Sequence, residues 1–363
     1  MIQSIHIQNF KSIENQIFDF KPLTILTGTN SSGKSSVIQA ILLYTYKANN
    51  HYILDDYLSN FGKSSDWIYV HSKSKSFSIT PTMTNNKKKT KLIFDKTKDI
   101  LYFDTTNRKI NLTDIERTKD FPIFEKEIYY ISANRIGQEN QSKCRATIKC
   151  GMNGEYIFGF YESCKNETLT NEHLLSKTIA NTLNFQVSFW LYRILGLNLN
   201  VTTQVIDNAN VKISYKNFDL DSVNGTEMSP FNLGAGVSYL TKILILGLSL
   251  KEGDILIVEN PEVHLHPKAI SKFADFFVFL ANGGIQVILE THSEHIINKM
   301  RYSVFGGKIS KDNIQIYYRE RFDMPFESIQ INERGKYINE NNEIIEFPTG
   351  FFDSDLDKLL EMM

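Results

Sequence analysis

Apolar and polar residues alternate along residues 2–20, and the alternation is interrupted at Asn9-Phe10-Lys11-Ser12. A period of two is typical of half-buried strands, so this segment predicts two strands joined by a turn. The apolar run 23–26 predicts a buried strand, and residues 36–44 predict a helix. Short alternating runs between polar clusters then predict an antiparallel meander at 67–70, 77–79, 92–94 and 100–103.

The second half of the chain alternates apolar strand patterns with helix patterns. Strands are expected at 127–132, 254–258, 285–290, 314–318 and 328–331, and helices at 239–250 and 267–281. The region 139–227 has the weakest pattern, with a strand expected at 156–161, a helix at 173–195, and strands at 201–206 and 211–215. No sustained heptad repeat runs through it, which argues against a coiled-coil arm. The pattern as a whole predicts an α/β fold with a mixed central sheet.

The composition is that of an ordinary folded protein. Of 363 residues, 42% are hydrophobic and 22% charged, and 40 basic against 41 acidic residues give a net charge of −1. Affinity for DNA could therefore come only from a local patch. The cluster Lys87-Lys88-Lys89-Thr90-Lys91 is one candidate, and a solvated loop is the alternative.

Cysteine spacing and hydropathy indicate the compartment. Cys144, Cys150 and Cys164 lack a paired spacing, which fits free thiols in a reducing compartment and argues against zinc. The longest apolar run, 243–250, is shorter than the roughly 20 residues that cross a bilayer. We expect a cytoplasmic protein with no signal peptide, membrane anchor or membrane partner.

The segment from Gly28 to Ser35 has the P-loop spacing of a glycine, four residues and Gly-Lys-Ser, between the predicted strand and helix. Glycines let backbone N–H groups surround phosphate oxygens, and the helix N-terminus favours negative charge there. Lys34 is expected at the β- and γ-phosphates, and Ser35 at Mg²⁺. The expected nucleotide-binding residues of the loop are Asn30, Ser31, Ser32, Gly33, Lys34, Ser35 and Ser36.

Polar residues at other turns are candidates for the same site. Lys11 could reach the phosphates if the hairpin lies beside the P-loop, or it could be a solvated turn lysine. Arg135 and Gln138 could contact phosphate or position water, or they could be structural. A small-residue turn before a helix has the geometry that suits phosphate, and it contains Gly234, Gly236 and Ser238.

Two predicted strands end in titratable side chains, at the position where ligands of α/β proteins bind. The strand at 254–258 is followed by Glu259, Asn260 and Glu262, of which Glu259 suits coordination of Mg²⁺. The strand at 285–290 is followed by Thr291 and His292, and His292 is placed like a γ-phosphate sensor. Either feature alone is often structural, so their order along the chain carries the argument.

In that order the motifs resemble the heads of ABC-type ATPases in the P-loop AAA family, most closely the SMC, RecF and OLD-like group. The resemblance rests on residues 9–12, 28–35, 232–238, 259–267 and 291–293. It implies an ABC-ATPase head with ATP and Mg²⁺ as cofactors. It also implies a homodimer, in which ATP lies between the P-loop of one subunit and the signature turn of the other. Residues 347–353 resemble the F-P-x-G-F-F-D tail of a bacterial subfamily with relatives in anti-phage defence.

Two departures from the ABC pattern concern catalysis. Asn260 stands where the catalytic glutamate is expected, and an amide cannot accept a proton from water. Glu262 and His292 are the candidate substitutes for this base. Gly234 replaces the serine of the usual L-S-G-G-Q signature, which leaves backbone N–H groups and Ser238 for a phosphate contact. The resemblance therefore implies an ATPase with slow turnover.

We expect one ABC-type ATPase domain, 1–363, with a P-loop and antiparallel β lobe at 1–135, a helical insertion at 136–227 and a lobe with the signature, Walker B and histidine motifs at 228–363. Relatives of the OLD type carry a Toprim nuclease, which needs on the order of a hundred residues. Only residues 299–363 remain after the helix that follows the switch residues Thr291-His292-Ser293, so no nuclease is expected in this chain. The acidic residues Asp353, Asp355 and Asp357 are interpreted as a helix start.

The expected function is a switch in which ATP-driven dimerisation controls a separate effector or a DNA-bound partner, in anti-phage defence. One alternative is a DNA-stimulated repair ATPase of the RecF kind. Another is a module that holds ATP without hydrolysing it. Turnover and its dependence on DNA separate the three.

Overall fold

The structure is a computed structural model of the chain, and it describes residues 1–49, 52–59, 62–84, 90–105, 108–110, 121–176 and 179–347. Two sets of predictions lie outside these ranges. They are the contact of Lys87, Lys88 and Lys89 with DNA and the interpretation of the tail beyond Phe347.

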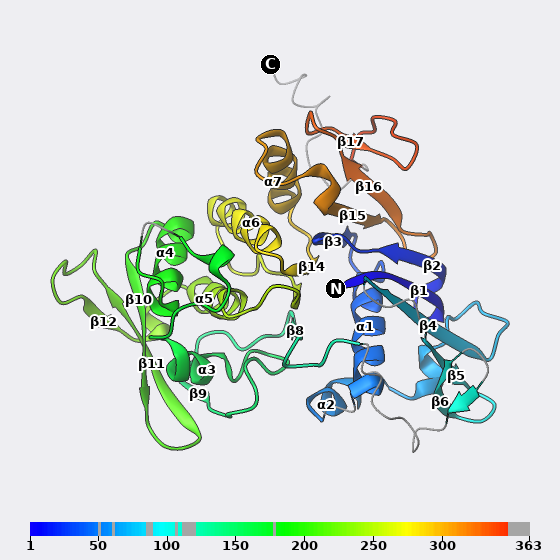
Figure 1. The fold of residues 1–363 in the computed structure, drawn as a ribbon, viewed down its shortest axis with the longest axis horizontal. Coiled ribbons are helices and arrows are strands. Elements are labelled where there is room, and N and C mark those ends of the chain that lie inside the picture. Colours follow the sequence, from blue (N-terminus) through cyan, green and yellow to red (C-terminus); the bar gives the residue numbers. More distant parts are fainter. Residues whose placement is uncertain are drawn as a thin grey trace.

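A seven-stranded mixed sheet forms the centre of the molecule, in the order β17-β16-β15-β3-β14-β13-β8 (Figure 1). The strands from β15 to β8 run parallel, and β16 and β17 are antiparallel additions at one edge. The bounds are β3 Leu23–Gly28, β8 Ile128–Ile131, β13 Ile255–Glu259, β14 Gln286–Glu290, β15 Ile314–Arg319, β16 Glu327–Ile331 and β17 Tyr337–Ile338. The parallel strands are buried along almost their whole length because both of their faces are covered.

Register within this sheet brings the functional strand ends together. In the pairing of β13 with β14, Glu259 lies opposite Glu290. Next to them, β14 pairs with β3, which leads into the P-loop. The carboxyl ends of three neighbouring strands therefore meet at one edge, as expected where α/β proteins bind ligands.

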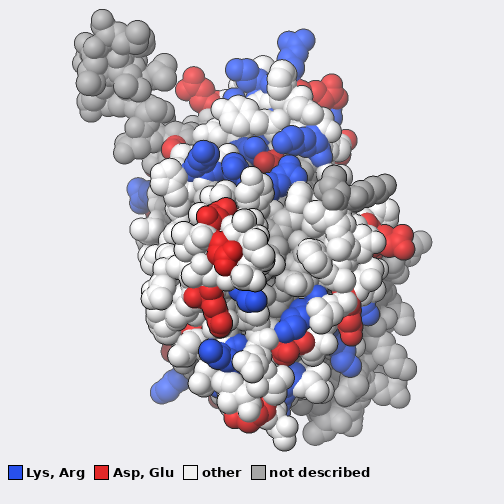
Figure 2. Space-filling view, turned by 90° about the vertical axis from the view of Figure 1, so that its left-hand side faces the viewer, with Lys and Arg blue, Asp and Glu red and all other residues white. Residues whose placement is uncertain are grey.

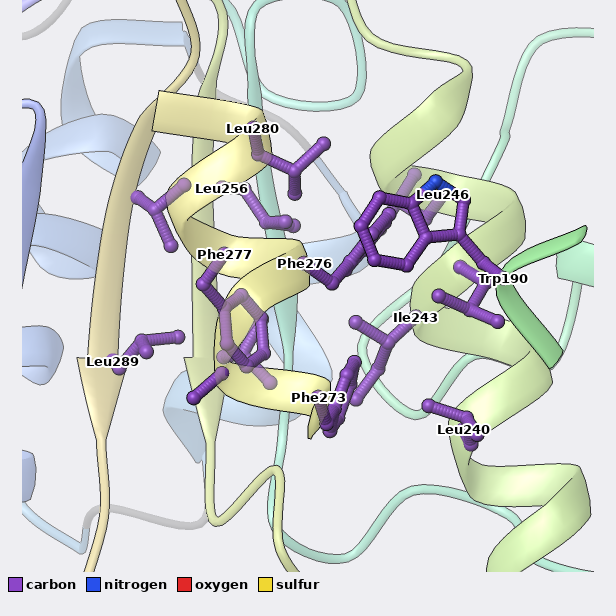
Figure 3. Packing of buried hydrophobic residues seen from close by; sticks show 14 of the residues in the cluster. Trp190, Leu240, Ile243, Leu246, Leu256, Phe273, Phe276, Phe277, Leu280 and Leu289 are labelled. Atoms are coloured by element: carbon purple, nitrogen blue, oxygen red, sulfur yellow. The ribbon is translucent and has the colours of Figure 1, made fainter. Parts of the chain in front are cut away.

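Helices cover both faces of the central sheet. They are α1 (Lys34–Asn49), α5 (Ala235–Leu248), α6 (Pro267–Asn282) and α7 (Glu294–Phe305). On one face α6 packs against α4 (Leu183–Leu195), with the Trp190 ring 5.0 Å from the Phe276 ring between Ile243, Leu246 and Leu280 (Figure 3). On the other face α1 packs into a second apolar cluster shared with the N-terminal strands.

A second sheet of six strands, β2-β1-β4-β5-β6-β7, lies over α1 (Figure 1). Its bounds are β1 Ile2–Phe10, β2 Ile13–Asp19, β4 Ser76–Met83, β5 Thr90–Asp95, β6 Ile100–Thr105 and β7 Arg108–Ile110. The expected hairpin and most of the meander are confirmed. The strand expected at 67–70 is wrong, since a 3-10 helix (Ser64–Trp67) ends there and Ile68 makes only an isolated bridge to Phe10. Helix α2 (Ile53–Ser59) was not predicted.

Residues 141–228 contain a small third sheet with helices packed on it. Strands β10 (Leu199–Val205), β11 (Asn210–Asn217) and β12 (Thr226–Met228) form it, and β9 (Gln141–Lys143) also pairs with β11. The strand expected at 156–161 is in fact helix α3 (Ile157–Cys164), because a short apolar run does not distinguish a buried strand from a buried helix.

The helix expected at 173–195 begins only at Leu183. Residues Glu172–Leu174 form a separate 3-10 turn, and Thr182 is the residue that precedes α4. Two further 3-10 turns are Pro230–Asn232 and Lys311–Asn313. Within the described ranges, no helix is both long enough and apolar enough to cross a membrane.

Candidate functional site

The P-loop connects β3 to α1. At two positions of this loop only glycine fits. A Cβ atom on Gly28, where φ is 141°, would lie 2.0 Å from the carbonyl oxygen of Arg319. A Cβ atom on Gly33, where φ is 96°, would lie 2.0 Å from Oγ of Ser12. The turn between β1 and β2, which contains Ser12, and strand β15, which contains Arg319, therefore hold the loop from both sides. Arg319 adds to this by donating hydrogen bonds to Oγ (3.1 Å) and to the carbonyl oxygen (2.8 Å) of Ser12.

Lys34 is buried inside the loop. Its ammonium donates to the carbonyl oxygens of Thr29 at 2.7 Å and Gly28 at 3.2 Å, and burial lowers its pKa. Of the other predicted loop residues, Asn30 and Ser31 are exposed while Ser32 and Ser36 are buried. The hydroxyl of Ser36 lies 3.2 Å from that of Ser12. The start of α1 at Lys34 places the loop at a helix N-terminus, which favours a chain of phosphates.

One carboxylate, Glu290, contacts the hydroxyl of Ser35, and a second, Glu259, lines the same cavity as Ser35. Oγ of Ser35 donates to Oε1 of Glu290 at 2.9 Å, and Glu259 is the register partner of Glu290 on the adjacent strand. Oε2 of Glu259 also accepts a hydrogen bond from the backbone N–H of Ala133 at 3.1 Å. Glu290 is only 6% exposed, and its other oxygen, Oε2, accepts no hydrogen bond from the described residues.

Burial and the nearby charge of Glu259 raise the pKa of Glu290 to about 7. A buried carboxylate with an orphaned oxygen beside a second carboxylate is the environment that a divalent cation relieves. Among the described residues, no three His, Cys, Asp or Glu side chains converge on one point. The donor set is therefore a hydroxyl and two carboxylates, and it fits Mg²⁺, which commonly takes one or two carboxylates and completes its shell with water and phosphate oxygens.

Asn260, Glu262 and His292 lie together beyond the end of β13. Asn260 adopts a left-handed conformation with φ of 45°, and its Oδ1 is buried without a hydrogen-bond partner among the described residues. Oε1 of Glu262 accepts a hydrogen bond from the backbone N–H of His292 at 2.8 Å. Oε2 of Glu262 is buried and has no hydrogen-bond partner among the described residues. Burial raises the pKa of Glu262 and lowers that of His292. Both the amide and the carboxylate thus have an oxygen left to bind a solvent molecule or ligand.

Arg135 is a buried clamp on the Walker B segment. Its guanidinium donates to the carbonyl oxygens of Glu259 and Asn260, each at 2.9 Å, and lies 4.9 Å from the centre of the Tyr239 ring. It is 2% exposed, and burial lowers its pKa to about 10. In this structure Arg135 therefore holds the backbone that presents Glu259, which is the structural role left open by the sequence.

Gln138 and the small-residue turn also lie together. The Gln138 amide donates to the carbonyl oxygens of Pro230 (3.0 Å) and Leu233 (2.5 Å), just before the turn. Gly234 precedes α5 without a side-chain cap, and a Cβ on Gly236 would lie 2.4 Å from the carbonyl oxygen of His264. Ser238 is buried and hydrogen-bonded to Tyr215. Backbone N–H groups are therefore the donors that this turn offers, and contacts of Gln138 and Ser238 with nucleotide stay predictions.

Lys11 occupies the turn between β1 and β2 in a left-handed conformation with φ of 50°. Its amine donates to Oε1 of Gln39 on α1 at 2.7 Å, and burial lowers its pKa to about 8. The hairpin turn thus lies against the P-loop helix, as the phosphate hypothesis requires. Direct contact of Lys11 with phosphate stays a prediction.

A cavity of about 680 Å³ opens beside Ser35 and Glu259. Its wall includes Gln39, Tyr57 of α2 and Tyr130 of β8. The hydroxyls of Tyr57 and Tyr130 lie 3.2 Å apart. Four residues of this site, Gln39, Tyr57, Tyr130 and Glu290, were not among those predicted from the sequence. Glu290 could have been found as the last residue of an apolar strand, by the same signal that identified Glu259.

Comparisons with known proteins give the family. Residues 23–298 match the protein family described as "AAA domain, putative AbiEii toxin, Type IV TA system". The Old nuclease of Escherichia phage P2 is similar, with 24% identity over 359 residues that cover 86% of this chain and 59% of that protein. The chain therefore spans less than two thirds of the length of this curated relative.

Two solved structures show the same fold. An SMC head bound to the C-winged helix domain of ScpA matches with a TM-score of 0.58 and 13% identity, covering 92% of this chain and 98% of that one. An SMC head domain with an extended coiled coil bound to the C-terminal domain of ScpA, derived from Pyrococcus furiosus, matches with a TM-score of 0.55 and 11% identity over 91% and 96%. The expected fold class is thus confirmed. The chain belongs to the AAA-domain family that its residues 23–298 match, and it is folded as an ABC-type P-loop ATPase head.

Proposed function

We propose that this protein binds ATP with Mg²⁺, dimerises around the nucleotide and hydrolyses it slowly, so that the closed dimer acts as a switch for a separate effector. The observation that carries the proposal is the group formed by Ser35, Glu259 and Glu290 beside a Walker B segment whose next residue is Asn260. It supplies a cation site while lacking a carboxylate at the position of the usual base.

The binding step follows from Lys34 and Ser35. The P-loop N–H groups and the N-terminus of α1 would hold the β- and γ-phosphates, and the Lys34 ammonium would turn from its carbonyl partners to them. Mg²⁺, when bound, neutralises phosphate charge and withdraws electrons from phosphorus. Ser35, Glu259 and Glu290 are the side chains that would hold it.

The slow step follows from Asn260 and Glu262. Because an amide has no basic lone pair, Asn260 can orient a water molecule through Oδ1 but cannot take its proton. Glu262 has a free oxygen, Oε2, and a raised pKa, so it is the best-placed proton acceptor at this end of β13. His292 is held near it through its backbone N–H and, with a lowered pKa, would be neutral at pH 7. We assign Glu262 the role of base.

The dimer step follows from the turn before α5. Gly234 leaves the first N–H groups of this 14-residue helix without a side-chain cap, and the His264 segment packs directly against Gly236. A groove of about 340 Å³ at this point is bordered by His264, His266 and Lys268. Positive charge and free N–H groups suit the γ-phosphate of an ATP molecule bound to a second copy.

The experiment is to measure the mass of the protein in solution by light scattering with and without ATP and Mg²⁺. We expect a monomer that becomes a dimer with ATP, and a Lys34→Ala variant that stays monomeric. ATP binding without any change in mass would overturn the switch. Steady-state hydrolysis should be slow and should stay slow when DNA is added.

Strong stimulation by DNA would instead favour the repair ATPase. On the face that carries the insertion, acidic and basic side chains are interspersed, with a basic band only across its upper part (Figure 2). Below this band, the described residues of this face form no continuous basic track that would follow a DNA backbone. The control of an effector in phage defence is part of the proposal and is tested by whether genes beside this one encode a nuclease or toxin that the ATP-bound dimer binds.

A further inference from the structure

The segment 260–265 follows β13 as a turn and carries Asn260 and Glu262, which are proposed to orient water and to accept its proton. The N–H of Leu265 donates to the carbonyl oxygen of Glu262 at 3.0 Å and closes the turn. Arg135 holds the start of the turn by donating to the carbonyl oxygen of Asn260 at 2.9 Å. The position of both groups therefore depends on how this turn is held.

Helix α5 holds the other end of the turn, at His264. The carbonyl oxygen of His264 lies so close to the start of the helix that a Cβ atom on Gly236 would be 2.4 Å from it. The His264 ring lies against the Tyr239 ring, with the ring centres 5.1 Å apart and the planes tilted by 33°. His264 also has a left-handed backbone, with φ of 62°, which a residue other than glycine keeps only where its surroundings hold it.

Tyr239 contacts the residues that hold both ends of the turn. The guanidinium carbon of Arg135 lies 4.9 Å from the centre of the Tyr239 ring, within the range of a cation–π interaction. The segment after Arg135 lies against the same ring, because a Cβ atom on Gly137 would be 2.9 Å from the Tyr239 hydroxyl oxygen. Arg135 at the start of the turn and His264 at its end thus share one aromatic partner.

This partner belongs to the helix that begins at the small-residue turn. Tyr239 stands about one helical turn after Gly236, in the helix whose start is proposed to meet the ATP of a second copy. A helix transmits displacement as a rigid element. A shift at the start of α5 therefore reaches the Tyr239 ring, and through it both ends of the turn that carries Glu262.

We propose that Tyr239 is a positioning residue that couples the start of α5 to Glu262. The role rests on the proposed dimer and on Glu262 as its base. Phosphate of the second copy's ATP would fix the start of α5, and Tyr239 would then hold Arg135 and His264 in the arrangement that places Glu262 for proton transfer. Glu262 serves the ATP held by its own P-loop, so Tyr239 connects the two nucleotide sites of the dimer.

The first test needs no nucleotide and measures hydrogen exchange of the backbone of residues 260–265 by mass spectrometry. Tyr239→Leu removes the aromatic face and should speed exchange of this turn about fivefold, as expected for the loss of an aromatic and a cation–π contact. Tyr239→Phe keeps the ring and should exchange like the wild type. Gly137→Ala leaves Tyr239 in the chain but forces its ring to shift, so it should also speed exchange.

The second test separates positioning from general loosening of the fold. It measures single-turnover hydrolysis together with the affinity for ATP and the ATP-dependent mass. Tyr239→Leu should lower the hydrolysis rate about tenfold while ATP affinity and dimer formation stay at the wild-type values. In a Glu262→Gln background the same substitution should lower the rate about twofold or less, because the group that Tyr239 positions is gone.

Tyr302→Leu is the matched control, because Tyr302 is an exposed tyrosine of α7 outside these contacts. It should change neither measurement. The coupling is overturned if Tyr239→Leu and Glu262→Gln lower the rate additively, or if Tyr239→Phe behaves like Tyr239→Leu. A wild-type protein that neither dimerises with ATP nor hydrolyses it would contradict the proposed function. The exchange of residues 260–265 in Tyr239→Leu would still decide for or against the positioning role of Tyr239.

Discussion

The hydroxyl of Ser35 donates a 2.9 Å hydrogen bond to Oε1 of Glu290, which joins the P-loop helix to the end of β14. Sequence reasoning assigned the cation to Ser35 and Glu259 and did not include Glu290. The bond makes Glu290 the second carboxylate of the site, and its pKa of about 7, raised by burial and by Glu259, has consequences for both stability and metal binding.

The stability of the nucleotide-free protein should depend on Glu290. Because the folded state raises this pKa from 4.5 to about 7, folding favours the protonated carboxyl, and the unfolding free energy falls as the pH rises between these values. Glu290→Gln keeps an acceptor for Ser35 and removes this cost. We expect it to be more stable than the wild type at pH 8 by about 3 kcal/mol and equally stable below pH 4.5. Denaturant unfolding at both pH values checks this, with the exposed Glu252→Gln as control.

Binding of Mg²⁺ should weaken as the pH falls. A protonated Glu290 cannot coordinate a cation, so the affinity for Mg²⁺ in the presence of an ATP analogue should drop about tenfold from pH 8 to pH 6. In Glu290→Gln the affinity should be low at both pH values. Titration calorimetry measures both proteins, and an equal pH dependence in the two would show that Glu290 does not bind the metal.

The rate of hydrolysis should depend on residue 260. Asn260→Glu places a carboxylate at the position of the usual base, and single-turnover hydrolysis should be at least about tenfold faster. The φ angle of 45° at Asn260 is unfavourable for glutamate, so the variant should also lose about 1 kcal/mol of stability. Asn260→Gln has the same length without a base. If it accelerates hydrolysis equally, the gain does not come from proton transfer.

Dimerisation should depend on the turn before α5. Space around Gly234 is open, since no atom lies within 4 Å of a Cβ built there, and its φ of −61° suits any residue. Gly234→Asp should preserve the fold, because aspartate is a favourable residue at a helix start. Its charge should repel the phosphate of the partner's ATP and abolish the ATP-dependent dimer. Gly234→Ser, a neutral cap, should dimerise, and light scattering distinguishes the two.

Stability should depend strongly on Arg135. Arg135→Met leaves the carbonyl oxygens of Glu259 and Asn260 buried without their donor, at a cost of about 3 kcal/mol. Arg135→Lys keeps the charge but cannot donate to both oxygens in one plane, so we expect an intermediate loss. Thermal unfolding of the three proteins gives the order. A methionine variant as stable as the wild type would show that the clamp contributes little.

Local patterns predicted much of the fold, and of the candidate cation site they predicted Ser35 and Glu259. The hairpin, the P-loop between strand and helix, and the strands that end at Glu259 and Glu290 each depend on residues close together in the chain. Periodicity failed where burial came from distant contacts. Helix α3 was expected to be a strand because its sequence is a short aromatic run. Such a run is compatible with either a buried strand or a buried helix, and the spacing of its apolar residues does not distinguish them.

The sequence by itself determined that a P-loop, an acidic strand end and a small-residue turn exist in the order of an ABC-type head, because each is a short segment with its own chemistry. Only the tertiary structure decided which side chains share a site. The register of β13 with β14 places Glu290 beside Glu259, and α2 brings Tyr57 to Tyr130. Such contacts join residues far apart in the chain, and they arise from the packing of whole elements, which no local pattern encodes.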